Sequence, residues 1–224
     1  MSEDDEFSAA RDRMVASQLC ERDIVDPRVL EAMRTVPRHL FVPLELRHLA
    51  YADAPLPIGH RQTISQPYIV ALMVQLCAIQ PEHIVLEVGA GSGYQAAILA
   101  RLAAQVYTVE RIPELAHGAR QTLAQCGVLN VEVIEGDGTH GLPEHAPYDA
   151  ILVAAAAPRV PGPLQEQLAE GGALVVPVGG WEGQVLERWC RHGNDLSRER
   201  LAAVAFVPLV GSEGWSGQDP EELC

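Results

Sequence analysis

The spacing of apolar residues near the start of the chain is helical. Between positions 8 and 34 they recur every three or four residues, as they do on a helix with one buried face. The pattern is interrupted at Asp26-Pro27. Proline is tolerated at the first position of a helix, and an aspartate before it can accept a hydrogen bond from a free amide. We therefore expect two helices here, the second starting at Pro27 with Asp26 as its N-cap.

The next stretch is broken by prolines at positions 37, 43, 55 and 57, which predicts loops with one short helix near residues 43–50. Residues 62–67 are polar and typical of a turn. Apolar residues then return at helical spacing and predict a helix over residues 68–78. Residues 7–80 are therefore expected to form a helical N-terminal lobe.

From Pro81 onwards, short apolar runs alternate with helical patterns. The expected strands are 83–89, 105–110, 131–136, 148–155 and 172–179. The expected helices are 92–103, 112–127 with Gly127 as C-cap, and 161–171. This alternation predicts a parallel sheet with helices on both faces, whose ligands bind at the carboxyl ends of the strands. Residues 185–191 and 201–210 predict two further strands, added antiparallel at the edge.

The stretch VLEVGAGSGYQ, residues 85–95, predicts a strand that runs into a glycine-rich turn. Dinucleotide sites use G-x-G-x-x-G, whereas Gly89-Ala90-Gly91-Ser92-Gly93 is G-x-G-x-G and the bulky Tyr94 follows. Glu87, two residues before the first glycine, disfavours a phosphate and favours a cation. S-adenosylmethionine carries a sulfonium and an ammonium group and no phosphate, so this turn favours that cofactor.

Two further acidic residues follow the next two expected strands. Glu110 ends the second strand, where a carboxylate can accept hydrogen bonds from both ribose hydroxyls of an adenosine. Asp137 follows the third strand in Glu135-Gly136-Asp137-Gly138 and is placed to accept from the adenine amino group. Three acids at successive strand ends favour a methyltransferase of the Rossmann-like class I fold, but they do not identify the methyl acceptor.

Several longer motifs resemble those of the protein-L-isoaspartate O-methyltransferase family, over roughly residues 11–210. They are VPRHLFVP (36–43), LPIG and QTISQPYIVA (56–71), VLEVGAGSGYQAAILA (85–100), VERIPEL (109–115), GDG (136–138), APYDAILVAAAAPRVP (146–161), LAEGGALVVPVG (168–179) and FVPLV (206–210). The TISQP segment and the PYDAI block are the most specific of these within this fold. Without the resemblance, Ser65 could simply cap the helix that follows it.

The resemblance implies a protein repair enzyme. Such an enzyme transfers a methyl group from S-adenosylmethionine to the free α-carboxylate of L-isoaspartyl residues and leaves S-adenosylhomocysteine. The ester closes to a succinimide, which hydrolyses in part to normal aspartate. Because a carboxylate is ionised at pH 7, its methylation needs no general base. We therefore expect Ser65 to orient the acceptor carboxylate by a hydrogen bond and not to act as a covalent nucleophile.

The resemblance also assigns the remaining site residues. Ser65 takes the active-site role. Cofactor contacts are expected from Thr63, Glu87, Gly89, Ala90, Gly91, Ser92, Gly93, Glu110, Arg111, Gly136 and Asp137. Acceptor contacts are expected from Ile64, Ser65, Val153, Ala154, Pro208 and Leu209.

Three positions depart from the family pattern. His60-Arg61 precedes the QTIS run, where the family usually has a small or polar pair. Arg61 can either place a cation near an anionic acceptor or face solvent. Thr139 follows GDG, where the family often has a bulky residue. The segment after Leu209, VGSEGW, fits no pattern, so any cofactor contact from the tail, residues 211–224, stays open.

Three other functions compete with this prediction. A methyltransferase for a small molecule or another protein site would keep the sheet, Glu110 and Asp137, but leaves TISQP unexplained. An NAD-dependent oxidoreductase needs a small residue at Tyr94 and a phosphate-tolerant turn, which Glu87 opposes. A catalytically inactive adenosine-binding module is disfavoured because the cofactor acids and the hydroxyl turn are all present. Binding of S-adenosylhomocysteine against NAD separates the oxidoreductase from the rest.

Composition indicates which partners the protein is not expected to bind and in which cellular compartment it is expected. The 224 residues include 30 acidic and 16 basic ones, for a net charge of −14, which disfavours nucleic acid and anionic membranes. Five cysteines without paired spacing predict free thiols and a cytoplasmic protein, and no metal site is expected. We expect one monomeric domain, with the lobe at 7–80, the cofactor-binding core at 81–180, the C-terminal strands at 181–210 and the tail thereafter.

Overall fold

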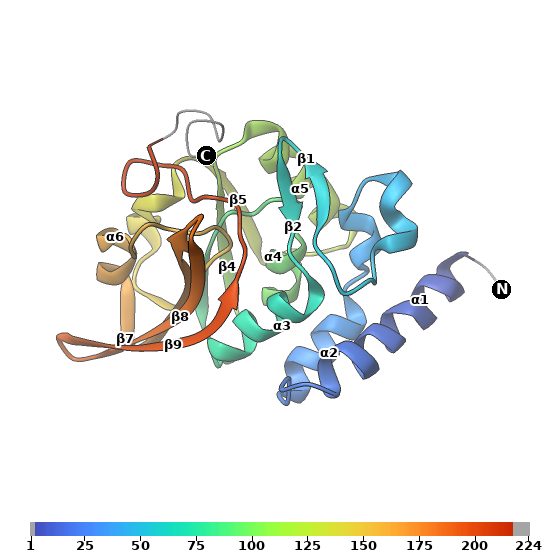
Figure 1. Ribbon diagram of the computed structural model, residues 1–224, viewed down its shortest axis with the longest axis horizontal. Coiled ribbons are helices and arrows are strands. Elements are labelled where there is room, and N and C mark those ends of the chain that lie inside the picture. Colours follow the sequence, from blue (N-terminus) through green and yellow to red (C-terminus); the bar gives the residue numbers. More distant parts are fainter. Residues whose placement is uncertain (1–2, 217–224) are drawn as a thin grey trace.

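The computed structural model describes residues 3–216 (Figure 1). The chain begins with helix α1, Glu3–Met14, which continues into a π-helical turn, η1, Val15–Cys20. Helix α2 spans Pro27–Thr35, and a carboxylate oxygen of Asp26 accepts from the Arg28 amide at 2.8 Å. The predicted break and N-cap are both confirmed.

The rest of the lobe contains one feature that the sequence did not predict. Two short 3₁₀ helices, η2 at Arg38–Phe41 and η3 at Leu44–Leu49, precede a β-hairpin of β1, Leu56–Gly59, and β2, Gln62–Ile64. Helix α3 follows at Pro67–Leu76. The expectation of a turn over 62–67 was therefore wrong at Gln62–Ile64, which pairs antiparallel with β1.

The turn of this hairpin explains the missed strands. His60 and Arg61 occupy its two central positions, and both have positive φ, 51° and 57°. Two-residue hairpin turns of this kind normally contain Asn or Gly, because few other residues adopt positive φ without strain. Because His60-Arg61 contains neither Asn nor Gly, the residue types of the turn do not predict this hairpin.

The main sheet has seven strands in the order β5-β4-β3-β6-β7-β8-β9. Their bounds are β3 Ile84–Val88, β4 Gln105–Glu110, β5 Val131–Glu135, β6 Tyr148–Val153, β7 Leu168–Gly180, β8 Gly183–His192 and β9 Asp195–Val204. Strands β5, β4, β3, β6 and β7 are parallel, whereas β8 and β9 are antiparallel additions (Figure 1). The predicted class, a Rossmann-like α/β sheet with a helical N-terminal lobe, is confirmed.

The connecting helices are shorter than their sequence patterns. They are α4 Tyr94–Leu99, α5 Pro113–Gln125 and α6 Gly162–Glu166, with 3₁₀ turns η4 at Gly138–His140 and η5 at Pro143–His145. The prediction of helix to residue 171 was wrong, because Leu168 already pairs with Tyr148 as the first residue of β7. Gly127 has φ +68° just after α5, and its amide donates to Ala124, as expected of the residue that ends a helix.

The expected strand over 201–210 also needs correction. Strand β9 ends at Val204, and the chain then leaves the sheet toward the end of β6, where Pro208 forms an isolated bridge with Ala156. The tail predicted after residue 210 is described as far as Ser216, and the remainder lies outside the described residues. Within residues 3–216, no helix combines the length and apolarity needed to span a membrane.

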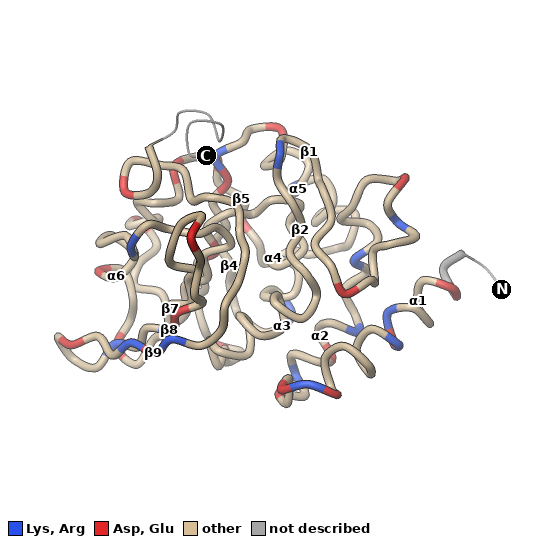
Figure 2. Tube along the Cα trace, in the orientation of Figure 1, with Lys and Arg blue, Asp and Glu red and all other residues tan. Residues whose placement is uncertain are grey.

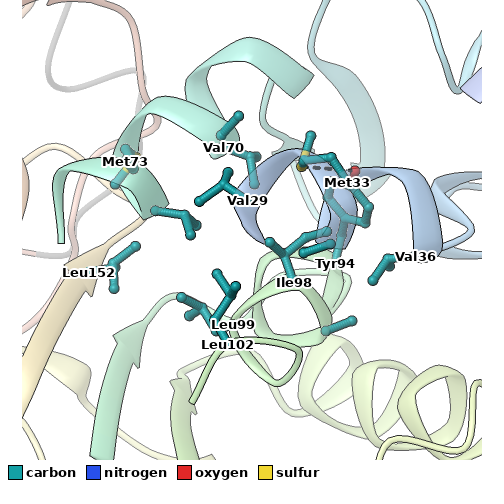
Figure 3. Close-up of a cluster of buried hydrophobic side chains, with 14 of the residues drawn as sticks. Val29, Met33, Val36, Val70, Met73, Tyr94, Ile98, Leu99, Leu102 and Leu152 are labelled. Atoms are coloured by element: carbon teal, nitrogen blue, oxygen red, sulfur yellow. Dashed lines mark hydrogen bonds between the residues drawn. The ribbon is translucent and has the colours of Figure 1, made fainter. Parts of the chain in front are cut away.

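The lobe and the sheet share one hydrophobic core. Figure 3 shows Met33 of α2, Val70 of α3 and Ile98 of α4 in one cluster, with Leu152 of β6 at its left. All four side chains are at most 1% exposed. Burying a side chain of this size stabilises the fold by roughly 1.5–3 kcal/mol, so this interface firmly anchors the lobe on the sheet.

A buried arginine ties the lobe to the hairpin side of the molecule. The Arg38 side chain is fully buried, and burial lowers the pKa of its guanidinium below the ordinary value. Its Nε donates to the Ala50 carbonyl at 2.7 Å, and Nη2 donates to the Ser65 carbonyl at 2.8 Å. The guanidinium also lies 4.8 Å from the centre of the Tyr94 ring. Arg38 thereby satisfies two backbone carbonyls of different segments and fixes the position of Ser65.

Replacing Arg38 by Met should lower the free energy of unfolding by about 2–4 kcal/mol, because the Ala50 and Ser65 carbonyls lose their donors. Urea unfolding monitored by circular dichroism measures the change. The control is Arg34→Met on the exposed face of α2, expected within about 0.5 kcal/mol of the parent protein. Equal effects of the two substitutions would contradict a bridging role for Arg38.

Candidate active site

A cavity of about 770 Å³ opens at the carboxyl edge of the parallel strands. Most of its wall is built from four segments far apart in the sequence. These are the hairpin and the residues after it (His60–Ser65), the turn after β3 (Gly89–Ser92), the end of β4 (Glu110–Ile112) and the segment after β9 (Ala205–Val210). Ligands bind at this edge in open α/β sheets, so this cavity is the candidate active site.

The glycine-rich turn has the backbone that its sequence predicts. Gly89, Gly91 and Gly93 all have positive φ, between 54° and 94°, which favours glycine. The Gly93 amide donates to the Ala90 carbonyl at 2.8 Å, and α4 then starts at Tyr94. Four residues of the turn, Gly89, Ala90, Gly91 and Ser92, line the cavity. Gly93 lies behind them, where a Cβ would meet Ala119 of α5 at 3.2 Å.

Glu110 ends β4 beside this turn. One of its carboxylate oxygens accepts from the Gly91 amide and the other from the Ile112 amide, both at 2.9 Å. The carboxylate is 5% exposed and lines the cavity, and Arg111 lines it as well. Because each carboxylate oxygen can accept a second hydrogen bond, Glu110 retains acceptor capacity for a ligand hydroxyl.

Glu87 lies deeper than the sequence indicated. It is fully buried, its Oε2 accepts from the Thr108 hydroxyl, and its Oε1 has no hydrogen-bond partner among the described residues. Burial raises the pKa of Glu87 to about 8, the charge of Glu110 adds to this, and the Thr108 and Gln95 side chains oppose it. Glu87 is therefore mostly protonated at neutral pH, unless a cation binds beside it.

Gln95 gives the cavity a second buried polar atom. Its Nε2 makes no hydrogen bond of good geometry among the described residues, although the Gln95 side chain is close enough to Glu87 to lower its pKa, and both residues line the cavity. Buried polar atoms without partners are uncommon in folded proteins and call for an explanation. A ligand with polar groups fits these atoms, which agrees with the cofactor inferred from the glycine turn.

The hairpin side supplies the predicted acceptor residues Ile64 and Ser65 and the predicted cofactor residue Thr63. Thr63, Ile64 and Ser65 all line the cavity. Helix α3 begins with Gln66 at the N-cap position and without any side-chain cap, so the capping role considered for Ser65 is not observed. Arg61 is exposed at the hairpin turn and also lines the cavity, so it combines the two positions considered for it.

The opposite wall comes from the end of β6 and the segment after β9. Ala154, Pro208 and Leu209 line the cavity, whereas Val153 is fully buried in β6 and does not. The Ala156 amide donates to the Val207 carbonyl, and the Leu209 amide donates to the Ala156 carbonyl, both at 2.8 Å. These hydrogen bonds hold the Pro208 segment beside the end of β6.

Besides Gly93, two predicted cofactor residues lie outside the cavity wall. Gly136 and Asp137 do not line it, although the next residue, Gly138, does. The Asp137 carboxylate accepts from Thr139 and from Ser212, a residue of the C-terminal segment. The structure thus brings together most of the predicted site residues, but it places Asp137 against the tail.

Some wall residues were not predicted. Gln95 belongs to the GSGYQ stretch, so its place directly after the glycine turn was an available signal. Phe206 belongs to the FVPLV motif and had a similar signal, whereas Trp181 at the β7–β8 turn had none, because only the packing of the sheet brings it to the cavity. Within residues 3–216, no group of three or more His, Cys, Asp or Glu side chains could hold a metal ion.

The fold and the site together define a class of protein. A parallel sheet whose carboxyl edge carries a G-x-G-x-G turn and an acid at the end of the second strand is that of a class I S-adenosylmethionine-dependent methyltransferase. The family model for protein-L-isoaspartate(D-aspartate) O-methyltransferase matches residues 9–214. The chain belongs to the protein-L-isoaspartate(D-aspartate) O-methyltransferase family.

Related sequences and structures agree with this assignment. The protein-L-isoaspartate O-methyltransferase of Methanoregula boonei is 60% identical over 208 residues, 93% of this chain and 96% of that protein. That of Synechococcus sp. is 57% identical over 213 residues, 92% of this chain and 87% of that protein. These identities confirm the resemblance seen in the sequence motifs.

Two solved structures share the fold. A protein-L-isoaspartate O-methyltransferase superposes with a TM-score of 0.82 and 28% identity, over 91% of this chain and 67% of that one. A Plasmodium falciparum protein of the same description, in complex with S-adenosyl-L-homocysteine, has a TM-score of 0.79 and 26% identity, over 89% of this chain and 98% of that one. The predicted cofactor class is confirmed.

The buried Glu87 should make the stability of the folded protein depend on pH. Its pKa in the folded state, about 8, lies above the ordinary value of 4.5, so the folded state binds more protons than the unfolded chain between these values. Its contribution to the free energy of unfolding therefore falls as pH rises toward 8. Glu87→Gln keeps the side chain neutral and should raise Tm relative to the parent more at about pH 8.5 than at about pH 5.5.

Thermal unfolding at both pH values measures this difference. Glu132→Gln, at an exposed glutamate of β5, is the matched control and should show no such trend. A Tm difference for Glu87→Gln that is the same at both pH values would contradict the raised pKa.

Proposed function

We propose that this protein transfers a methyl group from S-adenosylmethionine to the free α-carboxylate of L-isoaspartyl residues in damaged proteins and peptides. The resulting ester closes to a succinimide, which hydrolyses in part to normal aspartate. This is the activity of the family to which the chain belongs. The observation that carries the proposal is that the Thr63-Ile64-Ser65 segment and the glycine turn form two walls of one cavity.

Methyl transfer to a carboxylate requires that the two reactants are positioned, but it does not require a general base. When bound, S-adenosylmethionine supplies a methyl group on a positively charged sulfur, which passes to a carboxylate oxygen of the acceptor. The acceptor carboxylate is already ionised at neutral pH, so no proton has to be removed from it. The protein therefore has to bind the carboxylate, orient it and exclude water.

The cofactor side of the cavity is assigned to the turn after β3 and its neighbours. We assign Glu110 to the ribose hydroxyls, because its carboxylate has acceptor capacity left and lines the cavity. Glu87 and Gln95 are assigned to polar groups of the cofactor, because each has a buried atom without a partner among the described residues. Gly89 and Gly91 let the backbone approach closely, since neither has a side chain to fill the space.

The acceptor side is assigned to the hairpin end and the opposite wall. The Ser65 hydroxyl lies on the cavity wall and is not used as a helix cap, so it is available to donate to the acceptor carboxylate. Arg38 holds the Ser65 backbone from below through the 2.8 Å hydrogen bond to its carbonyl. Ala154, Pro208 and Leu209 form an opposite wall without charge, which helps to exclude water once the acceptor is bound.

The partners and compartment follow as further proposals. The excess of acidic residues supports an enzyme that does not bind nucleic acid, and Figure 2 shows basic residues interspersed with acidic ones, without a continuous basic stretch in this view. The described cysteines, Cys20, Cys77, Cys126 and Cys190, are free thiols, which supports the cytoplasm. A monomer is proposed because one chain supplies both sides of the cavity.

Two peptides of identical sequence test the reaction, one with an isoaspartyl link and one with normal aspartate. The protein is incubated with labelled S-adenosylmethionine, and base-labile methyl ester is counted. Label should appear on the isoaspartyl peptide alone, because only that link leaves an α-carboxylate free. Label on neither peptide, with S-adenosylhomocysteine shown to bind, would contradict the acceptor assignment and leave the cofactor assignment standing.

Ser65→Ala should lower kcat/KM for the isoaspartyl peptide about 10- to 100-fold, because the acceptor carboxylate loses a charge-assisted hydrogen bond. The Kd of S-adenosylhomocysteine, measured by calorimetry, should stay within about twofold because Ser65 is assigned to the acceptor side. Ser197→Ala on the exposed strand β9 is the control. Unchanged kcat/KM in the Ser65 variant would refute the orienting role.

A further inference from the structure

An exposed tryptophan lines the cavity at the turn between β7 and β8. Trp181 is 65% exposed, and of the exposed large hydrophobic side chains in residues 3–216 it alone lines the cavity. A single exposed apolar side chain needs no functional explanation by itself. In the wall of a binding site, however, an indole ring offers a large apolar surface on which a ligand can pack.

The backbone of this turn allows a bulky residue at its tip. Gly180 pairs with Gly183, so Trp181 and Glu182 are the two residues of the turn. Gly179 and Gly183 have φ values of +133° and +146°, in a region that favours glycine. Neither Trp181 nor Glu182 has a positive φ. The glycines therefore adopt the unusual conformation of the turn, and the tip accommodates tryptophan without backbone strain.

The strand order places Trp181 on the acceptor side of the cavity. The glycine turn follows β3 and Glu110 ends β4, whereas Trp181 follows β7, which lies two strands from β3 on the side away from β4. Two strand spacings are roughly 10 Å. Strand β7 also continues through Val176–Gly180 beyond its last pair with β6, Leu152 with Val175, so the turn projects past the edge of the sheet. Trp181 therefore lies away from the cofactor residues.

A glutamine of β8 fixes a second aromatic residue beside this hairpin. The Gln184 side-chain nitrogen donates to the Phe206 carbonyl at 3.0 Å, and its side-chain oxygen accepts from the Phe206 amide at 2.6 Å. Ala205 and Phe206 line the cavity, as Trp181 does. These three residues, Trp181, Ala205 and Phe206, are called the apolar subsite below.

The charges of the cavity wall favour an uncharged ligand group at the apolar subsite. Among the described residues, the carboxylates that line the cavity are those of Glu87 and Glu110, and both are assigned to the cofactor. On the acceptor side Arg61 supplies a positive charge, and Glu182 does not line the cavity. A cationic side chain of the acceptor would meet Arg61 and no lining carboxylate, whereas an aromatic side chain can pack on Trp181.

We propose that the apolar subsite binds an aromatic or large apolar side chain of the acceptor, one or two residues from the isoaspartyl link, and that Trp181 determines this preference. An indole ring has few rotatable bonds, so it loses little conformational entropy when a side chain packs on it. The inference rests on the proposed function, because it concerns the neighbours of the residue that is methylated.

A set of isoaspartyl peptides that differ at one position tests the preference. The reference peptide has alanine at the two positions on each side of the isoaspartyl link, and each further peptide carries one phenylalanine or one lysine at one of these positions. For at least one position, phenylalanine should lower KM of the parent protein about fivefold or more, with kcat within about twofold. Lysine at that position should not lower KM.

Three variants assign the preference to Trp181. Trp181→Ala should bring KM for the phenylalanine peptide within about twofold of the reference, with kcat and the Kd of S-adenosylhomocysteine within about twofold of the parent. Trp181→Phe keeps an aromatic ring and should retain most of the preference. Glu182→Ala is the matched control in the same turn and should match the parent. Because Trp181 and Glu182 are exposed, Tm of each variant should lie within about 2 °C of the parent.

The outcomes separate the subsite from the proposed function. Equal KM for all peptides with the parent, or a phenylalanine preference that persists in Trp181→Ala, would overturn the subsite and leave the proposed function standing. A preference for lysine over phenylalanine that Trp181→Ala abolishes would show that Trp181 selects a cation, and it would overturn the proposal as well. Methylation of none of the peptides would contradict the proposed function, and the subsite with it.

Discussion

The parallel pairing of five strands is the constraint on which the rest of the structure depends. Because β5, β4, β3, β6 and β7 run in one direction, their carboxyl ends lie at one edge of the sheet. The turns after β3, β4 and β6 therefore meet, although long helical segments separate them in the sequence. Because these strands are parallel, the glycine turn, Glu110 and Ala154 line the same cavity. A cofactor site at this edge is a consequence of strand direction.

The acceptor side depends on a different contact, the packing of the N-terminal helices on α4 and β6. That core positions Arg38 under the hairpin, and Arg38 holds the Ser65 carbonyl. Side chains of the N-terminal helices and of the sheet consequently belong to one buried cluster (Figure 3). A methyl transfer that relies on orientation needs such rigidity, since small displacements of either reactant reduce the rate steeply.

Three acidic residues lie near the ends of successive strands, and their surroundings give each carboxylate a different role. Glu87 is buried and mostly neutral, and it keeps one oxygen without a partner among the described residues. Glu110 shapes the glycine turn through backbone amides and still faces the cavity. Asp137 has its carboxylate filled by Thr139 and Ser212. The spacing of these residues is alike, but burial and available donors decide what each can bind.

The sequence by itself determined the sheet class, the break before Pro27, the glycine turn and the family, because local hydrophobic period, capping and turn chemistry are short-range properties. Ser65, Glu87 and Glu110, which the sequence predicted for the site, all line the cavity. Only the tertiary structure decided the hairpin at His60-Arg61, the early start of β7, the burial of Glu87 and the pairing of Asp137 with Ser212. Those features depend on contacts between segments distant in the chain, and no local pattern encodes which donor reaches which carboxylate once the chain has packed.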